Sequence, residues 1–304
     1  MHEFLERWRS GGGILLIDGG CGAELSQQGI GAGPPLWSAA GVHRAPGVVR
    51  EIHRSHVEAG AQLITALTFR THRRALERVG LVGCSLRLTC SAVRLAREAV
   101  EAASLERSVL VAGSLSPLED CFRADLVPDA EEALAEHRER ANELAFAGVD
   151  LVLAETFNSR VEAEIAISAA HEAGLSVMVS FTLRRDGRLP SGESLRDCAR
   201  AVVSSKPLAI GVNCCLPSVA GTAVAVLLEE CRGTGIAVGA YPNAGASLGR
   251  LGWSFSHTSP PSVLAESALP WVEAGARWVG GCCGATAGHI GALERALRGR
   301  LVAG

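Results

Sequence analysis

The segment that decides the fold, residues 129–181, reads DAEEALAEHRERANELAFAGVDLVLAETFNSRVEAEIAISAAHEAGLSVMVSF. Two stretches of helical composition, 129–147 and 159–173, are each closed by an Ala-Gly pair and followed by a short apolar run. A glycine at this place supplies the left-handed C-cap that ends a helix. The segment therefore predicts helix, strand, helix and strand in succession, which is typical of a parallel sheet.

The same alternation runs along the whole chain. Two further Ala-Gly pairs, Ala59-Gly60 and Ala274-Gly275, also stand directly before an apolar run. Residues 218–230 and 261–274 again have helical composition. Eight apolar runs are expected as strands, at residues 14–17, 63–69, 109–112, 151–154, 177–181, 209–212, 236–238 and 278–279. Such strands look buried on both faces, which favours the α/β class and a single (β/α)8 TIM barrel of parallel strands spanning residues 1–304.

A doubly wound open sheet is the rival architecture. Its dinucleotide-binding form carries G-x-G-x-x-G after the first strand, whereas this chain has Gly19-Gly20-Cys21-Gly22 there. Nicotinamide binding is therefore disfavoured. Segments 29–35 and 241–262, rich in Gly, Pro and Ser, are expected as loops on the barrel rim.

Composition narrows the function. The 304 residues are 48% hydrophobic and 20% charged with a formal net charge of -3, which is the balance of an ordinary globular protein and not of a nucleic-acid binder. No stretch is long and apolar enough for a membrane span, and the first residues lack the layout of a secretory signal. We therefore expect a cytoplasmic protein whose partners are small molecules, with no nucleic acid and no membrane.

Ten cysteines in a reducing compartment indicate thiol chemistry or metal binding. In a parallel barrel, the residues that end the strands converge on one face. The chemically unusual residues at those ends are Asp18, Glu155, the pair Cys214-Cys215 and the pair Cys282-Cys283. The ends of strands six and eight lie roughly 9 to 10 Å apart, so thiolates from both pairs could share one zinc ion.

The alternative for the two pairs is chance adjacency or a structural role. Cys84, Cys90, Cys198 and Cys231 are interpreted simply as core residues. A structural zinc would usually show four protein ligands and C-x2-C spacing, which this chain lacks. Three thiolates leave one coordination position open, and a thiol that binds there loses its proton. Such a site is suited to activating a substrate thiol, and hydrolysis is disfavoured.

Five motifs resemble, in order, those of the homocysteine S-methyltransferase family. They are Asp18-Gly19-Gly20-Cys21-Gly22-Ala23-Glu24-Leu25, Ala154-Glu155-Thr156, Gly211-Val212-Asn213-Cys214, Tyr241-Pro242-Asn243-Ala244-Gly245 and Gly280-Gly281-Cys282-Cys283-Gly284. The resemblance runs from about residue 13 to residue 293. It implies a zinc-dependent barrel that methylates the sulfur of homocysteine to give methionine, with a zinc-activated substrate thiolate and no further catalytic residue.

The resemblance also assigns roles to single residues. It implies Cys214, Cys282 and Cys283 as the zinc ligands, with Cys215 as an adjacent extra cysteine. The remaining implied substrate contacts are Glu155 for the homocysteine amino group, Asp18 with Gly19 and Gly20 closing over the same substrate, Trp37 near the donor, and Thr68 and Asn243 facing the site. The alternatives are a solvated rim carboxylate for Glu155 and a loop-capping role for Asp18.

The donor follows from what the chain lacks. Betaine calls for an aromatic cage, but the chain has one tyrosine, and Arg70 and Thr156 stand where the betaine-type enzymes carry tyrosines. A sulfonium, S-methylmethionine or S-adenosylmethionine, is therefore the expected donor, and Arg70 beside the donor region could select a carboxylate-bearing one. Alternatives are a barrel that binds zinc and a thiol amino acid without turnover, a cysteine redox switch, or a methyltransferase with another thiol acceptor or donor.

The histidines offer another set of possible ligands. His53, His56, His137 and His171 fall in helical segments away from the strand ends, so they are predicted to be ordinary surface or interface histidines.

Overall fold

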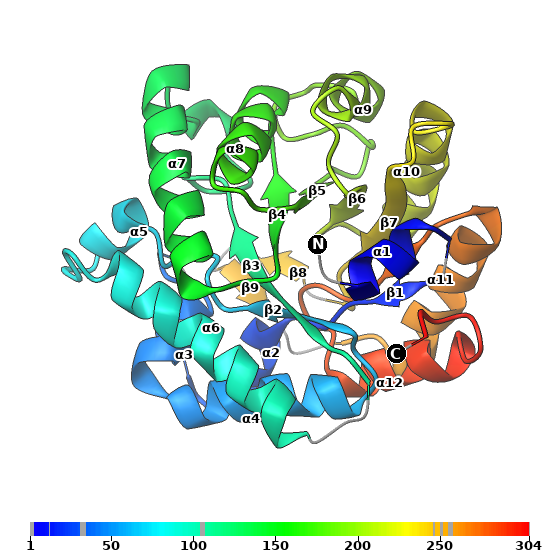
Figure 1. Cartoon of the computed structure of the whole chain (residues 1–304), viewed down its shortest axis with the longest axis horizontal. Helices are drawn as coiled ribbons and strands as arrows, with labels where there is room; N and C mark the ends of the chain where they lie inside the picture. Colours follow the sequence, from blue (N-terminus) through cyan, green and yellow to red (C-terminus); the bar gives the residue numbers. More distant parts are fainter. Residues whose placement is uncertain are drawn as a thin grey trace.

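Eight parallel strands surround a central axis in the computed structural model, which describes residues 3–11, 13–30, 35–103, 107–245, 247–249, 252–254 and 258–303 (Figure 1). The strand order is β1-β10-β7-β6-β5-β4-β3-β2. The two ends of this sheet join, because Ile17 and Leu63 form a parallel bridge and the Gln62 N–H donates to the Leu16 carbonyl at 2.7 Å. The predicted (β/α)8 barrel is therefore confirmed, and the doubly wound sheet is wrong.

Each barrel strand overlaps one of the predicted apolar runs, and two strands, β5 and β10, have the predicted first and last residues. The barrel strands are β1 (Leu15–Leu16), β2 (Leu63–Ala66), β3 (Leu110–Leu115), β4 (Leu151–Phe157), β5 (Val177–Phe181), β6 (Ala209–Asn213), β7 (Ala237–Tyr241) and β10 (Trp278–Val279). Strand β2 ends three residues before its predicted end because the Thr68 N–H turns back to the Ala66 carbonyl at 2.6 Å. Thr68 therefore lies in a turn and not on the strand.

Helices follow the strands as predicted. They are α1 (Glu3–Arg9), α2 (Cys21–Gln27), α3 (Ala39–Arg44), α4 (Pro46–Glu58), α5 (Arg73–Glu77), α6 (Ser85–Ala102), α7 (Ala130–Ala147), α8 (Arg160–Glu172), α9 (Leu195–Val203), α10 (Pro217–Glu230), α11 (Pro261–Ala274) and α12 (Ala287–Ala296). Asp129 caps α7 by accepting the N–H groups of Glu131 and Glu132, and Gly148 ends it with φ at 79°. The Ala-Gly pairs thus mark helix ends.

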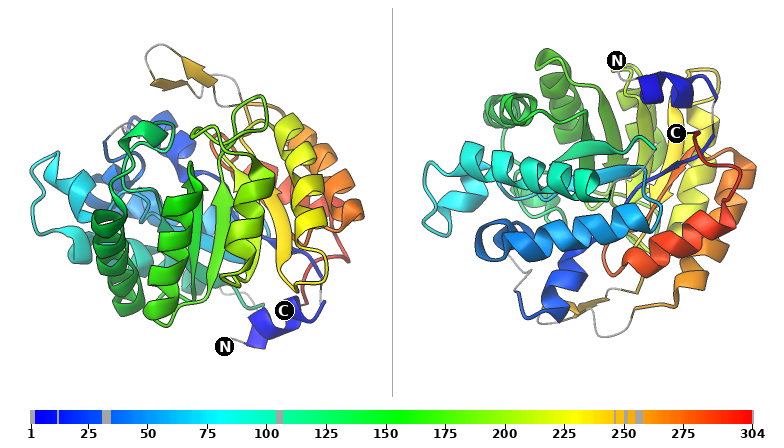
Figure 2. Two further views of the ribbon diagram at one scale, coloured as in Figure 1. Left: turned by 90° about the horizontal axis from the view of Figure 1, so that it is seen from above. Right: turned by 60° about the horizontal axis from the view of Figure 1, so that its bottom comes forward.

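Two apolar layers hold the barrel together. One fills its interior, from Leu15 on β1 to Trp278 on β10, and the other lies between the strands and the surrounding helices. Helix α1 adds Phe4, Leu5 and Trp8 to the interior layer, all of them buried. Figure 2 shows α1 at one end of the barrel and the β8–β9 hairpin (Ser247–Gly249 and Gly252–Ser254) at the other. The carboxyl ends of the strands are thus left to form a site.

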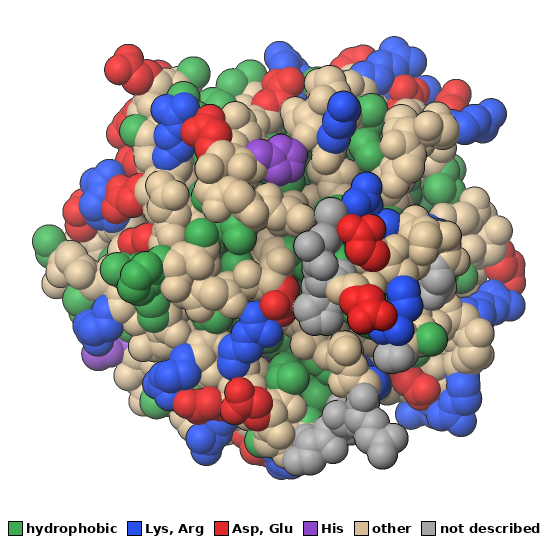
Figure 3. Space-filling view, viewed as in Figure 1, with side chains coloured by type: hydrophobic (Ala, Val, Ile, Leu, Met, Phe, Trp, Pro, Cys, Tyr) green, Lys and Arg blue, Asp and Glu red, His purple; other side chains and the backbone are tan. Residues whose placement is uncertain are grey.

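The rim loop predicted over 241–262 is confirmed in part, and its residues 246, 250–251 and 255–257 lie outside the described residues. Segment 241–262 contains the β8–β9 hairpin, which the sequence does not predict, and residues 31–34 of the other loop lie outside the described residues. On the face seen in Figure 3, acidic and basic side chains are interspersed. No helix within the described ranges is long and apolar enough to cross a membrane.

Three of the four histidines differ from the prediction. His53 and His56 on α4 and His137 on α7 are fully buried, and only His171 is exposed. They can be buried because each lies beside a polar group: His53 Nδ1 lies 3.9 Å from Cys21 Sγ, His56 Nε2 lies 2.9 Å from Glu24 Oε1, and His137 Nε2 lies 3.2 Å from the buried Glu162. These side chains face inward from their helices, so their position away from strand ends does not imply exposure.

Candidate active site and its thiol cluster

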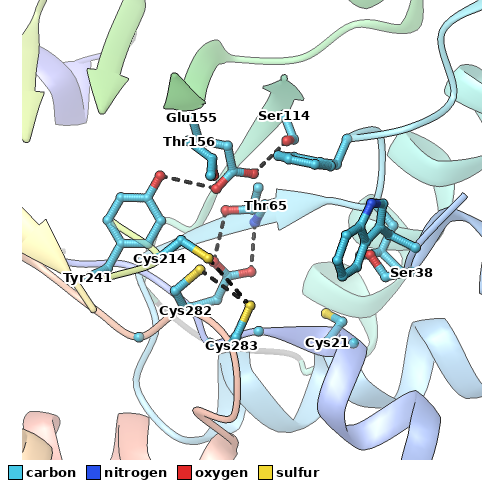
Figure 4. Close-up of a pocket in the computed structure, with 18 of the residues that line it drawn as sticks. Cys21, Ser38, Thr65, Ser114, Glu155, Thr156, Cys214, Tyr241, Cys282 and Cys283 are labelled. Carbon is cyan, nitrogen blue, oxygen red and sulfur yellow. Dashed lines mark hydrogen bonds between the residues drawn. The ribbon is translucent and has the colours of Figure 1, made fainter. Parts of the chain in front are cut away.

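A pocket opens at the carboxyl ends of the strands, as the barrel predicts. Seven of the eight barrel strands contribute to it, through their own residues or the segment that follows: β1, β2, β3, β4, β6, β7 and β10. Its polar and sulfur-bearing lining residues are Asp18, Cys21, Ser38, Thr65, Ser114, Cys121, Glu155, Thr156, Cys214, Tyr241, Cys282 and Cys283, and its large apolar ones are Trp37, Leu67, Phe69 and Phe122. Figure 4 shows Glu155, Tyr241 and three of the cysteines at one end, with Ser38 and Cys21 at the other.

Three cysteines meet in this pocket. The Sγ atoms of Cys214, Cys282 and Cys283 all lie within 4.8 Å of one another. The Cys214–Cys283 separation is 3.7 Å and the Cys282–Cys283 separation is 4.0 Å (Figure 4). Cys215 is buried in the core between strands and helices and is not part of the cluster. The structure thus separates the two members of the first cysteine pair, which spacing alone leaves undecided.

Backbone constraints hold the cluster in place. Cys214, directly after β6, has φ at +53°, in the left-handed region that non-glycine residues rarely adopt. The loop of Cys282 and Cys283 packs against the first strand's loop so closely that a Cβ on Gly20 would lie 2.5 Å from the Cys282 carbonyl oxygen. Asn243 Oδ1 accepts the Cys283 N–H at 3.2 Å. The Cys282–Cys283 loop is therefore fixed by neighbours that follow β1 and β7.

The cluster fits a zinc ion. Tetrahedral zinc with Zn–S bonds of about 2.3 Å places its sulfurs about 3.8 Å apart, close to the Cys214–Cys283 and Cys282–Cys283 separations of 3.7 and 4.0 Å. Hydrogen bonds from the Cys214 and Cys283 thiols hold the pKa of Cys282 well below its usual range, while the pKa of Cys214 is raised well above it. One thiolate stabilised by two thiols is a donor set that a metal would occupy with release of protons.

Glu155 is aimed into the pocket by an irregularity of β4. The register between β4 and β5 shifts between Ala154 and Phe157, and Thr156 has φ at +65°. The Glu155 carboxyl accepts a hydrogen bond from the Ser114 hydroxyl at Oε1, and its Oε2 lies 3.1 Å from the Tyr241 hydroxyl. It has no cationic partner among the described residues. Burial, with the negative charge at Cys282 as the second cause, raises its pKa to about 8.

Asp18 is the second carboxyl of the pocket. It is buried just after β1 and accepts the Thr65 N–H at 2.7 Å and the Thr65 hydroxyl at 2.8 Å. Burial raises its pKa, and the charge of His56 and the two Thr65 bonds oppose that shift. Asp18 thus lines the pocket, as a substrate contact would, and also ties β1 to β2, as a structural capping residue would.

A hydrogen-bond network links Glu155 to the thiol cluster. Asn213 Oδ1 accepts the Thr156 N–H at 3.0 Å and the Ser180 hydroxyl at 2.8 Å, and the Ser180 hydroxyl lies 2.7 Å from that of Tyr241. The Asn213 amide donates to Thr156 Oγ1 at 2.8 Å and to Cys282 Sγ at 3.8 Å. Strands β4, β5, β6 and β7 are thereby joined beneath the pocket.

Of the other five predicted substrate contacts, three line the pocket and two do not. Gly19, Gly20 and Trp37 line the pocket. Thr68 and Asn243 are buried and are not among its lining residues: Thr68 donates to the Ser114 carbonyl at 2.9 Å, and Asn243 contacts Cys283.

Sequence reasoning missed Thr65, Ser114 and Tyr241. Each lies within a barrel strand, and Ser114 and Tyr241 stand at or next to its carboxyl end, so strand position was the available signal.

Arg70 does not stand in the donor region as expected. Its buried guanidinium donates to the carbonyls of Pro117 at 2.8 Å and Glu119 at 2.6 Å, and it lies 4.9 Å from the ring centre of Phe69. It is not among the residues that line the pocket. Two backbone carbonyl groups satisfy this cation, so Arg70 supports the wall of the pocket from behind.

The fold and the site together define a barrel enzyme with a thiol cluster and a carboxyl in one pocket. The chain belongs to the homocysteine S-methyltransferase family, because the family model described as homocysteine S-methyltransferase matches residues 15–297. It is 33% identical over 298 residues to the homocysteine S-methyltransferase of Escherichia coli strain K12, with 92% of this chain and 94% of that protein covered. It is 31% identical to homocysteine S-methyltransferase 1 of Zea mays, with 95% and 96% covered.

A solved structure and a further sequence relative agree with this assignment. The metallated form of the homocysteine methyltransferase MmuM from Escherichia coli superposes with a TM-score of 0.82 at 30% identity, covering 96% of this chain and 99% of that one. By sequence, a selenocysteine Se-methyltransferase from Brassica oleracea is 27% identical, with 98% of this chain and 93% of that protein covered. The resemblance predicted from the motifs is confirmed.

Proposed function

We propose that this methyltransferase is zinc-dependent and moves a methyl group from a sulfonium, S-methylmethionine or S-adenosylmethionine, to the thiol of homocysteine to give methionine. The observation that carries the proposal is the meeting of three cysteine sulfurs and the Glu155 carboxyl in one pocket. The thiol cluster suits a metal that takes up a substrate thiol. A carboxyl nearby suits the ammonium group of the same amino acid.

The chain's own residues would divide the work as follows. Cys214, Cys282 and Cys283 would hold the zinc, which when bound would keep the substrate thiol deprotonated near neutral pH. Glu155 and Asp18 would orient the amino acid, so that its sulfur faces the methyl carbon in line with the leaving group. The donor leaves as a neutral thioether, so the step requires no acid from the protein.

The donor would lie toward the aromatic lining. Trp37 presents a ring to the pocket, and aromatic faces attract sulfonium cations. The absence of Lys, Arg and His among the described lining residues leaves the choice between S-methylmethionine and S-adenosylmethionine to shape. We further propose a single domain over residues 1–304 acting in the cytoplasm on small molecules, without nucleic acid, since the three thiols must stay reduced to bind a metal.

The test combines metal analysis with turnover. Protein purified with a reductant is analysed for zinc and incubated with homocysteine and each of S-methylmethionine, S-adenosylmethionine and betaine, while methionine is followed. About one zinc per chain with methionine from a sulfonium alone supports the proposal. Methionine from betaine alone would overturn the donor assignment. Zinc without turnover on homocysteine, followed by turnover on selenocysteine, would move the proposal to that acceptor.

A further inference from the structure

The contacts beneath Glu155 can all be hydrogen bonds in only one arrangement of their hydrogens. A backbone N–H can only donate, so the atom of Asn213 that faces the Thr156 N–H at 3.0 Å must be the amide oxygen. An amide oxygen can only accept, so the Ser180 hydroxyl, 2.8 Å from it, must donate its one hydrogen to that oxygen. The orientation of Asn213 is thus fixed by the backbone.

The same reasoning continues to the next hydroxyl. Ser180 has no second hydrogen, so its 2.7 Å contact with Tyr241 is a hydrogen bond only if the tyrosine donates. Tyr241 then has no hydrogen left for Glu155, whose Oε2 lies 3.1 Å from the phenol oxygen. Two oxygens at this distance inside the protein form a bond only if the carboxyl supplies the hydrogen.

We propose that the free enzyme holds Glu155 as a neutral carboxylic acid, and that Glu155 releases its proton when the ammonium group of an amino-acid acceptor binds beside it. Oε2 of the acid donates to Tyr241, and Oε1 accepts from Ser114 as a carbonyl oxygen should. Every link from Glu155 to Asn213 then has one hydrogen. This inference rests on the proposed function for its second half only.

Burial and the nearby negative charges act in the same direction. Asp18 after β1 and Cys282 after β10 place negative charge near Glu155 and raise its pKa, and together with burial they outweigh the hydroxyls of Ser114 on β3 and Tyr241 on β7, which lower it. Lys, Arg and His are absent from the described residues that line the pocket. Burial already raises the Glu155 pKa to about 8. The carboxylate form therefore has no positive charge to offset its loss of hydration until a cationic ligand binds.

Proton balance is simple in this step. The acceptor enters as an ammonium, Glu155 becomes a carboxylate, and one proton passes to the solvent through the open pocket. Tyr241 can then turn its hydrogen toward Oε2 at the cost of its bond to Ser180. Acceptor affinity should therefore rise about tenfold per pH unit between pH 6 and 7.5 through Glu155, because a proton competes with the ammonium.

The first test needs no ligand. Infrared spectra of the enzyme as purified, with its metal, are compared at pH 6.5 with those of Glu155→Gln and Tyr241→Phe. We expect the carbonyl band of a protonated carboxylic acid that vanishes in Glu155→Gln and moves to higher frequency in Tyr241→Phe, which removes the partner of the acid proton. If neither variant changes a band of a protonated acid, Glu155 is ionised and the proposal is wrong, whatever the enzyme's activity.

The second test measures the proton. Methionine has no thiol proton, so calorimetric titrations with it at pH 6.5, in buffers of different ionisation enthalpy, count only protons from the protein. We expect about one proton released per methionine in the wild type and about none in Glu155→Gln. Binding without proton release would refute the second half of the inference. Absence of methionine or homocysteine binding would count against the proposed function and would leave the infrared result standing.

Discussion

The pocket has two parts that are built differently. The strand part, which comprises Glu155, Tyr241, Cys214, Cys282 and Cys283, comes from β4, β7 and the residues directly after β6 and β10. It is held by a closed hydrogen-bond network. The loop part, which comprises Trp37, Ser38, Phe69 and Phe122, is apolar apart from one hydroxyl and comes from loops.

The difference teaches how one pocket can serve two substrates. A fixed distance between the carboxyl and the sulfurs suits an acceptor that carries both an amino group and a thiol. Loops vary more freely than strand ends, so the donor side can change without disturbing the metal. Substitutions in the strand part should therefore affect the metal and the acceptor, and those in the loop part should affect the donor.

The largest effect is expected from Cys282→Ser. Loss of one of three sulfurs should remove most of the bound zinc and lower kcat/KM at least about 1,000-fold, roughly 4 kcal/mol. Metal analysis and methionine formation measure both effects. Cys215→Ala is the matched control, since Cys215 lies outside the cluster and should keep the zinc. If Cys282→Ser retains full zinc content, the cluster is not the metal site.

Glu155→Gln should separate the two substrates. The charge-assisted bond to the acceptor ammonium is worth about 1.5–3 kcal/mol, so the acceptor KM should rise roughly 10- to 150-fold while the donor KM stays within a factor of two. Steady-state kinetics with each substrate varied in turn provide the measurement. An equal rise in both constants would mean that the strand part does not serve the acceptor alone.

The same residue makes a prediction about stability. The folded protein holds a proton on Glu155 up to about pH 8, whereas the unfolded chain releases it near the ordinary value of 4.5. A group with a raised carboxyl pKa contributes stability that is lost as pH rises through this interval. The wild type should therefore lose about 4 kcal/mol of unfolding free energy relative to Glu155→Gln between pH 5 and pH 8.5. Urea unfolding at both pH values checks this, and parallel pH profiles for the two proteins would contradict it.

Trp37→Ala tests the loop part. Removal of one aromatic face from a cation costs about 0.5–2 kcal/mol, so the donor KM should rise roughly 2- to 30-fold with zinc content and acceptor KM unchanged. Trp37→Phe keeps a ring and should recover most of the donor affinity. If both variants lower acceptor affinity instead, the division between the two parts is wrong.

The barrel and the thiol cluster could be predicted from sequence because both depend on local patterns. Apolar runs and Ala-Gly pairs mark strands and helix ends, and residues that follow strands converge whatever the details of packing. The network could not be predicted, since Ser114, Ser180 and Asn213 join one network only through the register of five strands, β3 to β7. The position of Arg70 depends on the fold of the loop that carries Pro117, which no periodic pattern determines.

The smallest effect is expected at Thr68, where the sequence predicts a residue that faces the site. Its hydroxyl donates to the Ser114 carbonyl at 2.9 Å and lies behind the pocket wall. Thr68→Val keeps the shape of the side chain and removes that bond, so we expect about 1 kcal/mol lower unfolding free energy and unchanged constants for both substrates. Chemical unfolding and steady-state kinetics of the variant measure the two quantities. A raised acceptor KM would show that Ser114 transmits the change to Glu155, which would extend the strand part by one residue beyond the pocket lining.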